Sequence, residues 1–164
     1  MRVSGRKLAK LSRESLLDVR ISDLVLSIEE TWLEPLIERV RTELEDRWIV
    51  HQPHFWLADE WFSPDGTPGV AIPFYLAHKR LMTLERYHMY EVEGGTQREC
   101  LMLLRHEIGH AVDTAYRLNR RRRWRELFGR PGTPYPDSYR PRPSSKKFVQ
   151  HLVGWYAQAH PLED

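Results

Sequence analysis

The first strong periodicity in the chain is helical and lies in TWLEPLIERVRTELEDRW, residues 31–48. Its large apolar side chains recur at the spacing of one helix face: Trp32, Leu36, Val40 and Leu44. Thr31 and Glu34 have the spacing of a capping box, in which each side chain accepts a hydrogen bond from a backbone amide at the helix start. The pattern predicts an amphipathic helix over residues 31–48.

A second helix is predicted from Thr96 to about Leu118, and it starts at another capping box formed by Thr96 and Glu99. At about 100° per residue, one side of this helix is apolar throughout. That apolar stripe consists of Leu101, Leu104, Ile108, Ala111, Val112 and Ala115. The other side carries polar residues, so we expect the helix to bury its back and to present its polar face to a cleft.

Two aromatic and β-branched runs between these helices have the composition of strands. They are HFWLADEW at 54–61 and GVAIPFYLA at 69–77. The turn-rich sequence SPDGTPG separates them, which predicts a short antiparallel sheet. Pro73 cannot donate a ladder hydrogen bond, so it belongs on an edge strand or at a strand end. Helices around a short sheet predict an α+β fold with a helical N-terminal part.

Composition and charge are those of a soluble globular chain. Of the 164 residues, 41% are hydrophobic and 29% are charged. No apolar run approaches the ~20 residues of a membrane span, and the N-terminus lacks the apolar core of a signal peptide. We therefore expect a cytoplasmic protein without a membrane partner. Residues 1–13 are basic and predict a flexible arm, followed by a single domain over 14–164.

The cysteine content limits the possible metal chemistry. The single cysteine, Cys100, cannot form an internal disulfide, and one thiol excludes a Cys-rich zinc module. By helical rotation Cys100 falls at the margin of the apolar stripe, which favours a small core residue over a metal ligand.

The polar face of the second helix carries HEIGH, in which His106 and His110 are four residues apart and Glu107 follows the first histidine. Side chains at i and i+4 on a helix lie ~5 to 6 Å apart at Cβ, close enough for two imidazoles to share a zinc ion. Zinc lowers the pKa of a bound water to about 7, and Glu107 is placed to accept the proton of that water. The alternative is that the two histidines are ordinary residues of a helix surface.

This motif resembles the zincin metallopeptidases. The longer string from AIPFYLAHKRLMTLE through LLRHEIGHAVDTAY to FVQHLVGWYAQAHPLED is similar to a bacterial family of zinc-binding metallopeptidases, over roughly residue 20 to the end. The resemblance implies a zincin-like fold and a gluzincin-like site with His106 and His110 as ligands, Glu107 as general base and an acidic ligand downstream. Relatives extend further, so we expect the ligand-bearing helix after the motif to be truncated and the domain to be C-terminally short.

The resemblance points to Glu163 as the third zinc ligand, because the acidic ligand of such sites opens a later helix. Asp113 shares the direction of the histidines but lies roughly 10 Å along the axis from His106, at 1.5 Å per residue. It is better placed as a hydrogen-bond acceptor for His110 or as a surface charge. His160 is a further candidate ligand, or the cap of the helix that follows it.

Other residues leave the function open in two respects. Five side chains are candidate donors to a tetrahedral oxyanion: Tyr116, Tyr139, Tyr156, His151 and His160. The segment RLNRRRRWR at 117–125 mixes basic and aromatic residues, as nucleic-acid surfaces do, although such runs are more often solvated helix faces.

The sequence therefore predicts a zinc-dependent peptidase acting on a peptide or protein substrate. The alternatives are a non-catalytic zinc-binding protein and a basic nucleic-acid-binding module.

Overall fold

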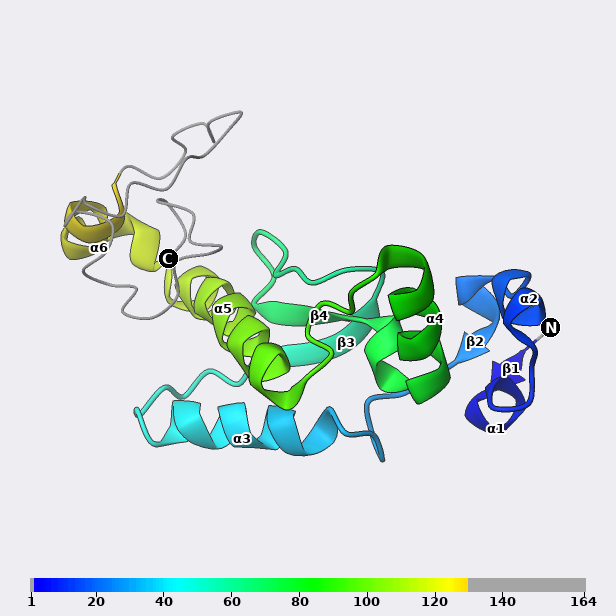
Figure 1. Ribbon diagram of the computed structural model, residues 1–164. Coiled ribbons are helices and arrows are strands. Elements are labelled where there is room, and N and C mark those ends of the chain that lie inside the picture. Colours follow the sequence, from blue (N-terminus) through cyan, green and yellow to red (C-terminus); the bar gives the residue numbers. More distant parts are fainter. Residues whose placement is uncertain (1, 130–164) are drawn as a thin grey trace. The chain divides into compact units, whose positions relative to one another are not determined.

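The computed structural model describes residues 2–129 (Figure 1). The described residues belong to two units, of which the first ends at Ala115 and the second begins at Tyr116. The described residues combine α-helices with two short sheets, as the α+β expectation requires. A single domain over 14–164 remains a prediction, because most of the second unit lies outside the described residues. The ligand-bearing helix expected after the HEIGH motif, together with its expected truncation, lies outside them as well.

The N-terminal part, where the sequence predicted a flexible arm, contains short helices and strands from residue 3 onward. It contains, in order, β1 (Val3–Ser4), α1 (Gly5–Leu8), α2 (Arg13–Leu17), η1 (Ile21–Asp23) and β2 (Leu24–Val25), and β1 pairs with β2 in parallel. Val3, Leu8 and Leu16 are buried in one small core with Leu81. The basic side chains between these positions are exposed. The apolar side chains of this basic segment therefore face the small core, and its charged side chains face the solvent.

The first predicted helix is confirmed as α3 (Glu34–Glu45), with a start that differs from the predicted capping box. The Thr31 hydroxyl accepts a hydrogen bond from the amide of Leu33, and the Glu34 carboxylate accepts one from the amide of Glu30 at 2.9 Å. Both predicted side chains therefore stabilise the helix start, but each binds a different amide from the one expected. The buried face of α3 consists of Leu36, Ile37, Val40 and Leu44.

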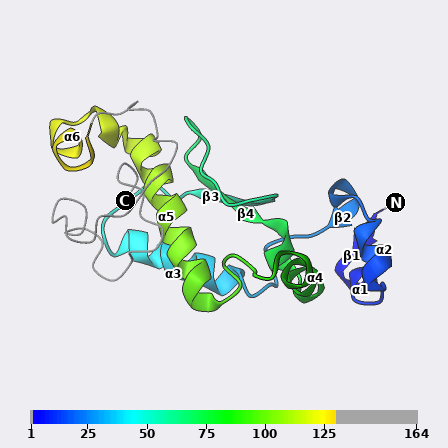
Figure 2. The same cartoon turned by 45° about the horizontal axis from the view of Figure 1, so that its top comes forward.

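The two predicted strands exist, as β3 (His54–Ala58) and β4 (Gly69–Pro73), but their antiparallel arrangement was wrong. They pair in parallel with Phe55 opposite Val70, and they lie side by side in both views (Figures 1 and 2). The connection over residues 59–68 is long enough to return the chain to the start of β3, so that β4 runs in the same direction. Phe62 of this connection accepts a hydrogen bond through its carbonyl from the amide of Ala71 in β4. β4 therefore has partners on both sides at Ala71, and all five of its residues are buried, as in the uniformly apolar strands of covered parallel sheets.

The second predicted helix is confirmed as α5 (Gln97–Tyr116), which follows η2 (Phe74–Ala77) and α4 (Lys79–Met89). The Thr96 hydroxyl accepts a hydrogen bond from the Glu99 amide at 3.3 Å, as the capping box predicts. The back of α5 lies in the main hydrophobic core together with residues of α3, β3, β4 and η2. Leu104 is completely buried and Ile108 nearly so, and burial of each side chain contributes about 1.5 to 3 kcal/mol.

An ion pair joins α5 to α3 at the solvent side of this core. Arg105 donates two hydrogen bonds to Glu43, from Nε to Oε2 at 2.8 Å and from Nη2 to Oε1 at 2.7 Å, and Arg39 donates a third from Nε to Oε1. These hydrogen bonds, chiefly those from Arg105, lower the pKa of the Glu43 carboxyl to about 2. The two-pronged contact fixes Arg105, and therefore the residue next to His106, against α3.

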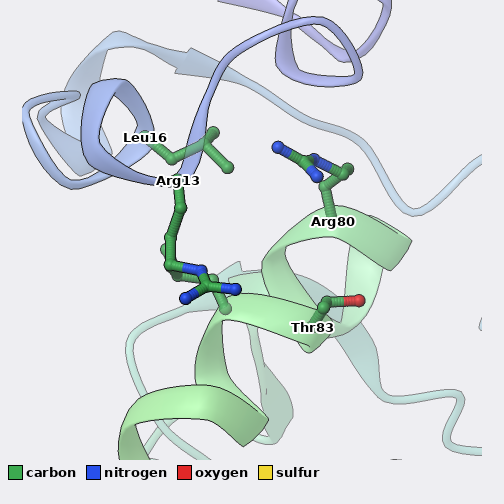
Figure 3. Close-up of a pocket in the computed structure, with 5 residues that line it drawn as sticks. Arg13, Leu16, Arg80 and Thr83 are labelled. Atoms are coloured by element: carbon green, nitrogen blue, oxygen red, sulfur yellow. The ribbon is translucent and has the colours of Figure 1, made fainter.

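A small pocket lies between the N-terminal part and α4, lined by Arg13 and Leu16 of α2 and by Arg80, Thr83 and Leu84 of α4 (Figure 3). Both arginines are already engaged. The Arg13 guanidinium lies 3.7 Å from the centre of the Tyr87 ring, and Arg80 Nη2 donates to the Leu11 carbonyl. The pocket includes no residue of α5, so we interpret it as part of the seam that holds the N-terminal part on α4.

The described part of the second unit contains η3 (Leu118–Arg120) and α6 (Arg122–Phe128). None of the helices within residues 2–129 has both the length and the apolar composition of a bilayer span.

The pairing of Glu43 with Arg105 predicts a pH-dependent stability. Because the pKa of Glu43 in the folded chain is about 2, below its ordinary value of 4.5, the stabilisation is complete above pH 4.5 and disappears as the pH falls to 2. We expect Glu43→Gln to lower the free energy of unfolding by about 1 kcal/mol at pH 7, and by progressively less below pH 4.5. Urea denaturation between pH 7 and pH 3 measures this difference.

The matched control is Glu38→Gln, which removes an exposed carboxylate of the same helix that accepts a hydrogen bond from Arg41 of α3 itself. Equal losses for the two variants, or a Glu43→Gln loss that grows as the pH falls, would contradict a special role for the contact between α3 and α5.

Candidate metal centre

The candidate centre is built on the polar face of α5, because the helix buries its opposite side in the core. His106 and His110 are each partly buried, and they lie one turn apart on this face. Their Nε2 atoms are 3.2 Å apart, with ring centroids separated by 4.9 Å and ring planes inclined at 78°. The structure therefore brings together the two imidazole nitrogens that the sequence predicted as a pair.

This separation fits two ligands of one tetrahedral zinc ion. With Zn–N bonds of ~2.0 to 2.1 Å and a tetrahedral angle, two ligating nitrogens lie about 3.3 Å apart. The observed 3.2 Å also suits a hydrogen bond in which one imidazole donates to the other. The separation of the two Nε2 atoms is therefore compatible with either arrangement.

Glu107 lies beside the first histidine and is the buried member of the motif. Glu107 is only 8% exposed. Among the polar and charged residues of the described chain, it is the one that is buried. Removing a carboxylate from water is costly unless hydrogen-bonding or charged partners compensate for the lost hydration. Burial at this position, next to paired histidines, is what a functional carboxylate on this face would show.

The third ligand is not defined by the described residues. Within residues 2–129, no group of three His, Cys, Asp or Glu side chains is arranged to hold a metal ion. Asp113 is partly buried, further along α5, and is not grouped with the two histidines in this way. Glu163, the ligand implied by family resemblance, and His160 both lie outside the described residues, as do all the oxyanion candidates except Tyr116.

Two further residues of the motif region have clear surroundings. Cys100 is fully buried in the core, and burial raises the pKa of its thiol to about 12, which confirms the core role expected of it. Gly109 lies on the exposed side of α5, and a Cβ added there would meet no heavy atom of the described chain within 4 Å. Close approach of another described segment therefore does not explain this glycine.

A tryptophan from the β3–β4 connection packs beside the start of α5. A Cβ added to Gly94 would lie 3.1 Å from Cζ2 of Trp61 and 3.2 Å from Cδ1 of Leu103, so the indole and the leucine pack against the same glycine. Gly94 has φ +71°, a conformation that residues with a Cβ adopt at a cost. Leu103 precedes Glu107 by one turn on α5. Trp61 and Leu103 therefore both limit the space at Gly94, just before α5 begins.

Sequence reasoning missed both Trp61 and the Glu43–Arg105 pair. Arg105 directly precedes HEIGH, so its position at the edge of the polar face of α5 could be predicted from the sequence. Its partner was not, because Glu43 is 62 residues away on an independent helix. Trp61 was the last residue of the predicted strand run HFWLADEW, and nothing in that run indicated that it packs beside Gly94.

Comparison with known proteins does not supply an assignment. No family model matches the chain, and no curated protein or solved structure matches it significantly. The functional argument therefore depends on the geometry and chemistry of α5.

The open space around Gly109 predicts a stabilising substitution. Glycine within a helix is less favourable than alanine by roughly 0.5 to 1 kcal/mol, and an added methyl group here meets no described atom. We expect Gly109→Ala to raise the free energy of unfolding by up to about 1 kcal/mol, measured by urea denaturation.

Gly94→Ala is the matched control, since it adds the same methyl group at a positive φ and within 3.1 Å of Trp61. It should destabilise the protein by about 1 kcal/mol or more. Destabilisation of the same size by Gly109→Ala would show that a close neighbour covers Gly109.

Proposed function

We propose that the protein is a zinc-dependent metallopeptidase with a zincin-like fold, which hydrolyses peptide bonds in a peptide or protein substrate. The observation that carries the proposal is the 3.2 Å separation of the His106 and His110 Nε2 atoms on one helix face. The buried carboxylate of Glu107 between them in sequence adds the second chemical group that hydrolysis requires. The resemblance of HEIGH to the zincin motif supports the same reaction.

The residues of α5 would divide the chemistry between them. His106 and His110 hold the ion through Nε2, and Glu163 is proposed as the third ligand. When bound, zinc supplies a polarised water with a pKa near 7 and stabilises negative charge on the substrate carbonyl oxygen. Glu107 accepts a proton from the attacking water and transfers it to the departing amine nitrogen, so the peptide bond breaks to give a carboxylate and an amine.

Asp113 is proposed to orient His110 rather than to bind the ion. A ligating imidazole commonly donates its second N–H to a carboxylate, which fixes the ring and raises its basicity. Asp113 follows His110 by three residues on α5, a spacing at which helical side chains are neighbours. We further propose a cytoplasmic location for the enzyme.

The proposal predicts a zinc-binding protein with one ion per molecule. We expect His110→Ala to remove most of the zinc, because one of the paired imidazoles is lost, and Glu163→Ala to weaken zinc binding at least roughly tenfold. Asp113→Ala should weaken it less. Elemental analysis after zinc loading and dialysis, followed by competition with a chelating dye, measures both the content and the affinity.

His88→Ala is the control, since it removes an exposed histidine of α4 and should leave the zinc content unchanged. A protein that takes up no zinc when zinc is offered would end the metallopeptidase proposal. Zinc lost with Asp113→Ala but retained with Glu163→Ala would reverse the assignment of the third ligand.

Glu107→Gln separates an enzyme from a non-catalytic zinc protein. The amide keeps the shape of the carboxylate but cannot accept a proton, so we expect unchanged zinc content and a loss of hydrolysis of at least roughly 100-fold. Cleavage of a quenched fluorescent peptide library provides the readout for hydrolysis.

Glu99→Gln changes an exposed glutamate in the first turn of the same helix and should retain activity. If Glu107→Gln loses zinc as completely as His110→Ala, Glu107 is a ligand or a structural residue. If zinc-loaded native protein cleaves no member of the library, the non-catalytic alternative is favoured.

A further inference from the structure

A dense group of arginines follows α5 and takes no part in the candidate metal centre. Residues 116–129 contain six arginines and one glutamate, so this segment alone exceeds the net charge of +2 of the whole chain. All six arginine side chains are exposed, and their positions are Arg117, Arg120, Arg121, Arg122, Arg123 and Arg125. The positive charge of the protein is therefore concentrated on a short folded segment.

Two of these arginines organise the segment. Arg125 donates hydrogen bonds to the carbonyls of Asn119 and Arg120, at 3.2 and 2.9 Å, and so folds α6 back onto η3. Arg122 forms an ion pair with Glu126 at 2.7 Å. Because these acceptors are carbonyl groups, no carboxylate among residues 2–129 neutralises the charge of Arg125.

The other four arginines are Arg117, Arg120, Arg121 and Arg123. Within residues 2–129, no carboxylate pairs with Arg117, Arg120, Arg121 or Arg123. The turn held by Arg125 carries Arg120 and Arg121, and the first turn of α6 carries Arg123. Several guanidinium groups in close succession on an ordered turn are suited to a ligand that bears one negative charge per repeating unit.

We propose that this arginine surface, residues 117–125, binds the phosphodiester backbone of single-stranded nucleic acid. Arginine suits phosphate because its planar donors can bind two oxygens at once. Trp124 lies within the surface and contacts Phe128, with ring centroids 5.1 Å apart, and both rings are partly exposed. Partly exposed aromatic rings beside arginines are the combination that stacks bases and binds the backbone of a single strand.

An anionic membrane fits the surface less well. Helices that lie in a membrane interface bury a large apolar face, and α6 offers only Trp124, Leu127 and Phe128 for such a face. The nucleic-acid proposal does not depend on the proposed peptidase activity, because none of its residues belongs to the HEIGH motif.

The test is fluorescence anisotropy of a labelled mixed-sequence 30-nucleotide DNA strand with the full chain. We expect micromolar, sequence-tolerant binding at 50 mM salt. If four arginines contact phosphates, affinity should fall roughly fiftyfold between 50 and 200 mM salt, as a slope of about −0.7 per contact implies for single strands. Arg120→Ala/Arg121→Ala/Arg123→Ala should weaken binding at least tenfold and reduce the slope.

The matched control Arg20→Ala/Lys79→Ala/Arg86→Ala removes the same number of exposed positive charges from separate places in the first unit. It should bind the strand nearly as well as the native chain, and thermal melting verifies that both triple variants are folded. Absence of binding at 50 mM salt, equal losses in the two triple variants, or equally tight binding of poly-glutamate or of phosphatidylserine vesicles would each overturn the proposal.

Discussion

Burial of the apolar back of α5 is the constraint on which the candidate centre depends. Because Leu104, Ile108 and Ala111 are buried in the core, α5 cannot rotate about its own axis. Its opposite face is therefore held in one orientation. The two histidines lie on that face because of their spacing alone. Their common direction is therefore a consequence of hydrophobic packing, and it requires no contact made by the histidines themselves.

The local features of the molecule were predictable from sequence, and the long-range ones were not. The Thr96 cap, the apolar stripe of α5 and the proximity of His106 to His110 all follow from helical geometry over a few residues. The parallel direction of β3 and β4 depends on the path of the connection between them, which composition does not encode. An alternating turn-rich linker suggested a hairpin, whereas pairing of Phe62 with Ala71 places β4 in the middle.

The N-terminal residues illustrate a second limit of sequence reasoning. Their high charge density suggested a solvated arm, because charge is visible in composition while burial is not. Val3 and Leu8 are separated by exposed basic side chains and still reach one small core with Leu16 and Leu81. Here a few apolar positions determine the structure, and the intervening charges only determine what faces the water.

The contact between Glu43 and Arg105 has a consequence for the order in which the molecule assembles. The two residues are 62 positions apart, so the loop they close includes β3, β4, η2 and α4. Closing so long a loop before its interior is ordered is entropically unfavourable, and contacts of high sequence separation form slowly. The α3–α5 contact should therefore form late in folding, once the sheet and α4 are in place. During synthesis α3, the sheet and α4 all leave the ribosome before the HEIGH helix does, so the surface that holds this helix is made first.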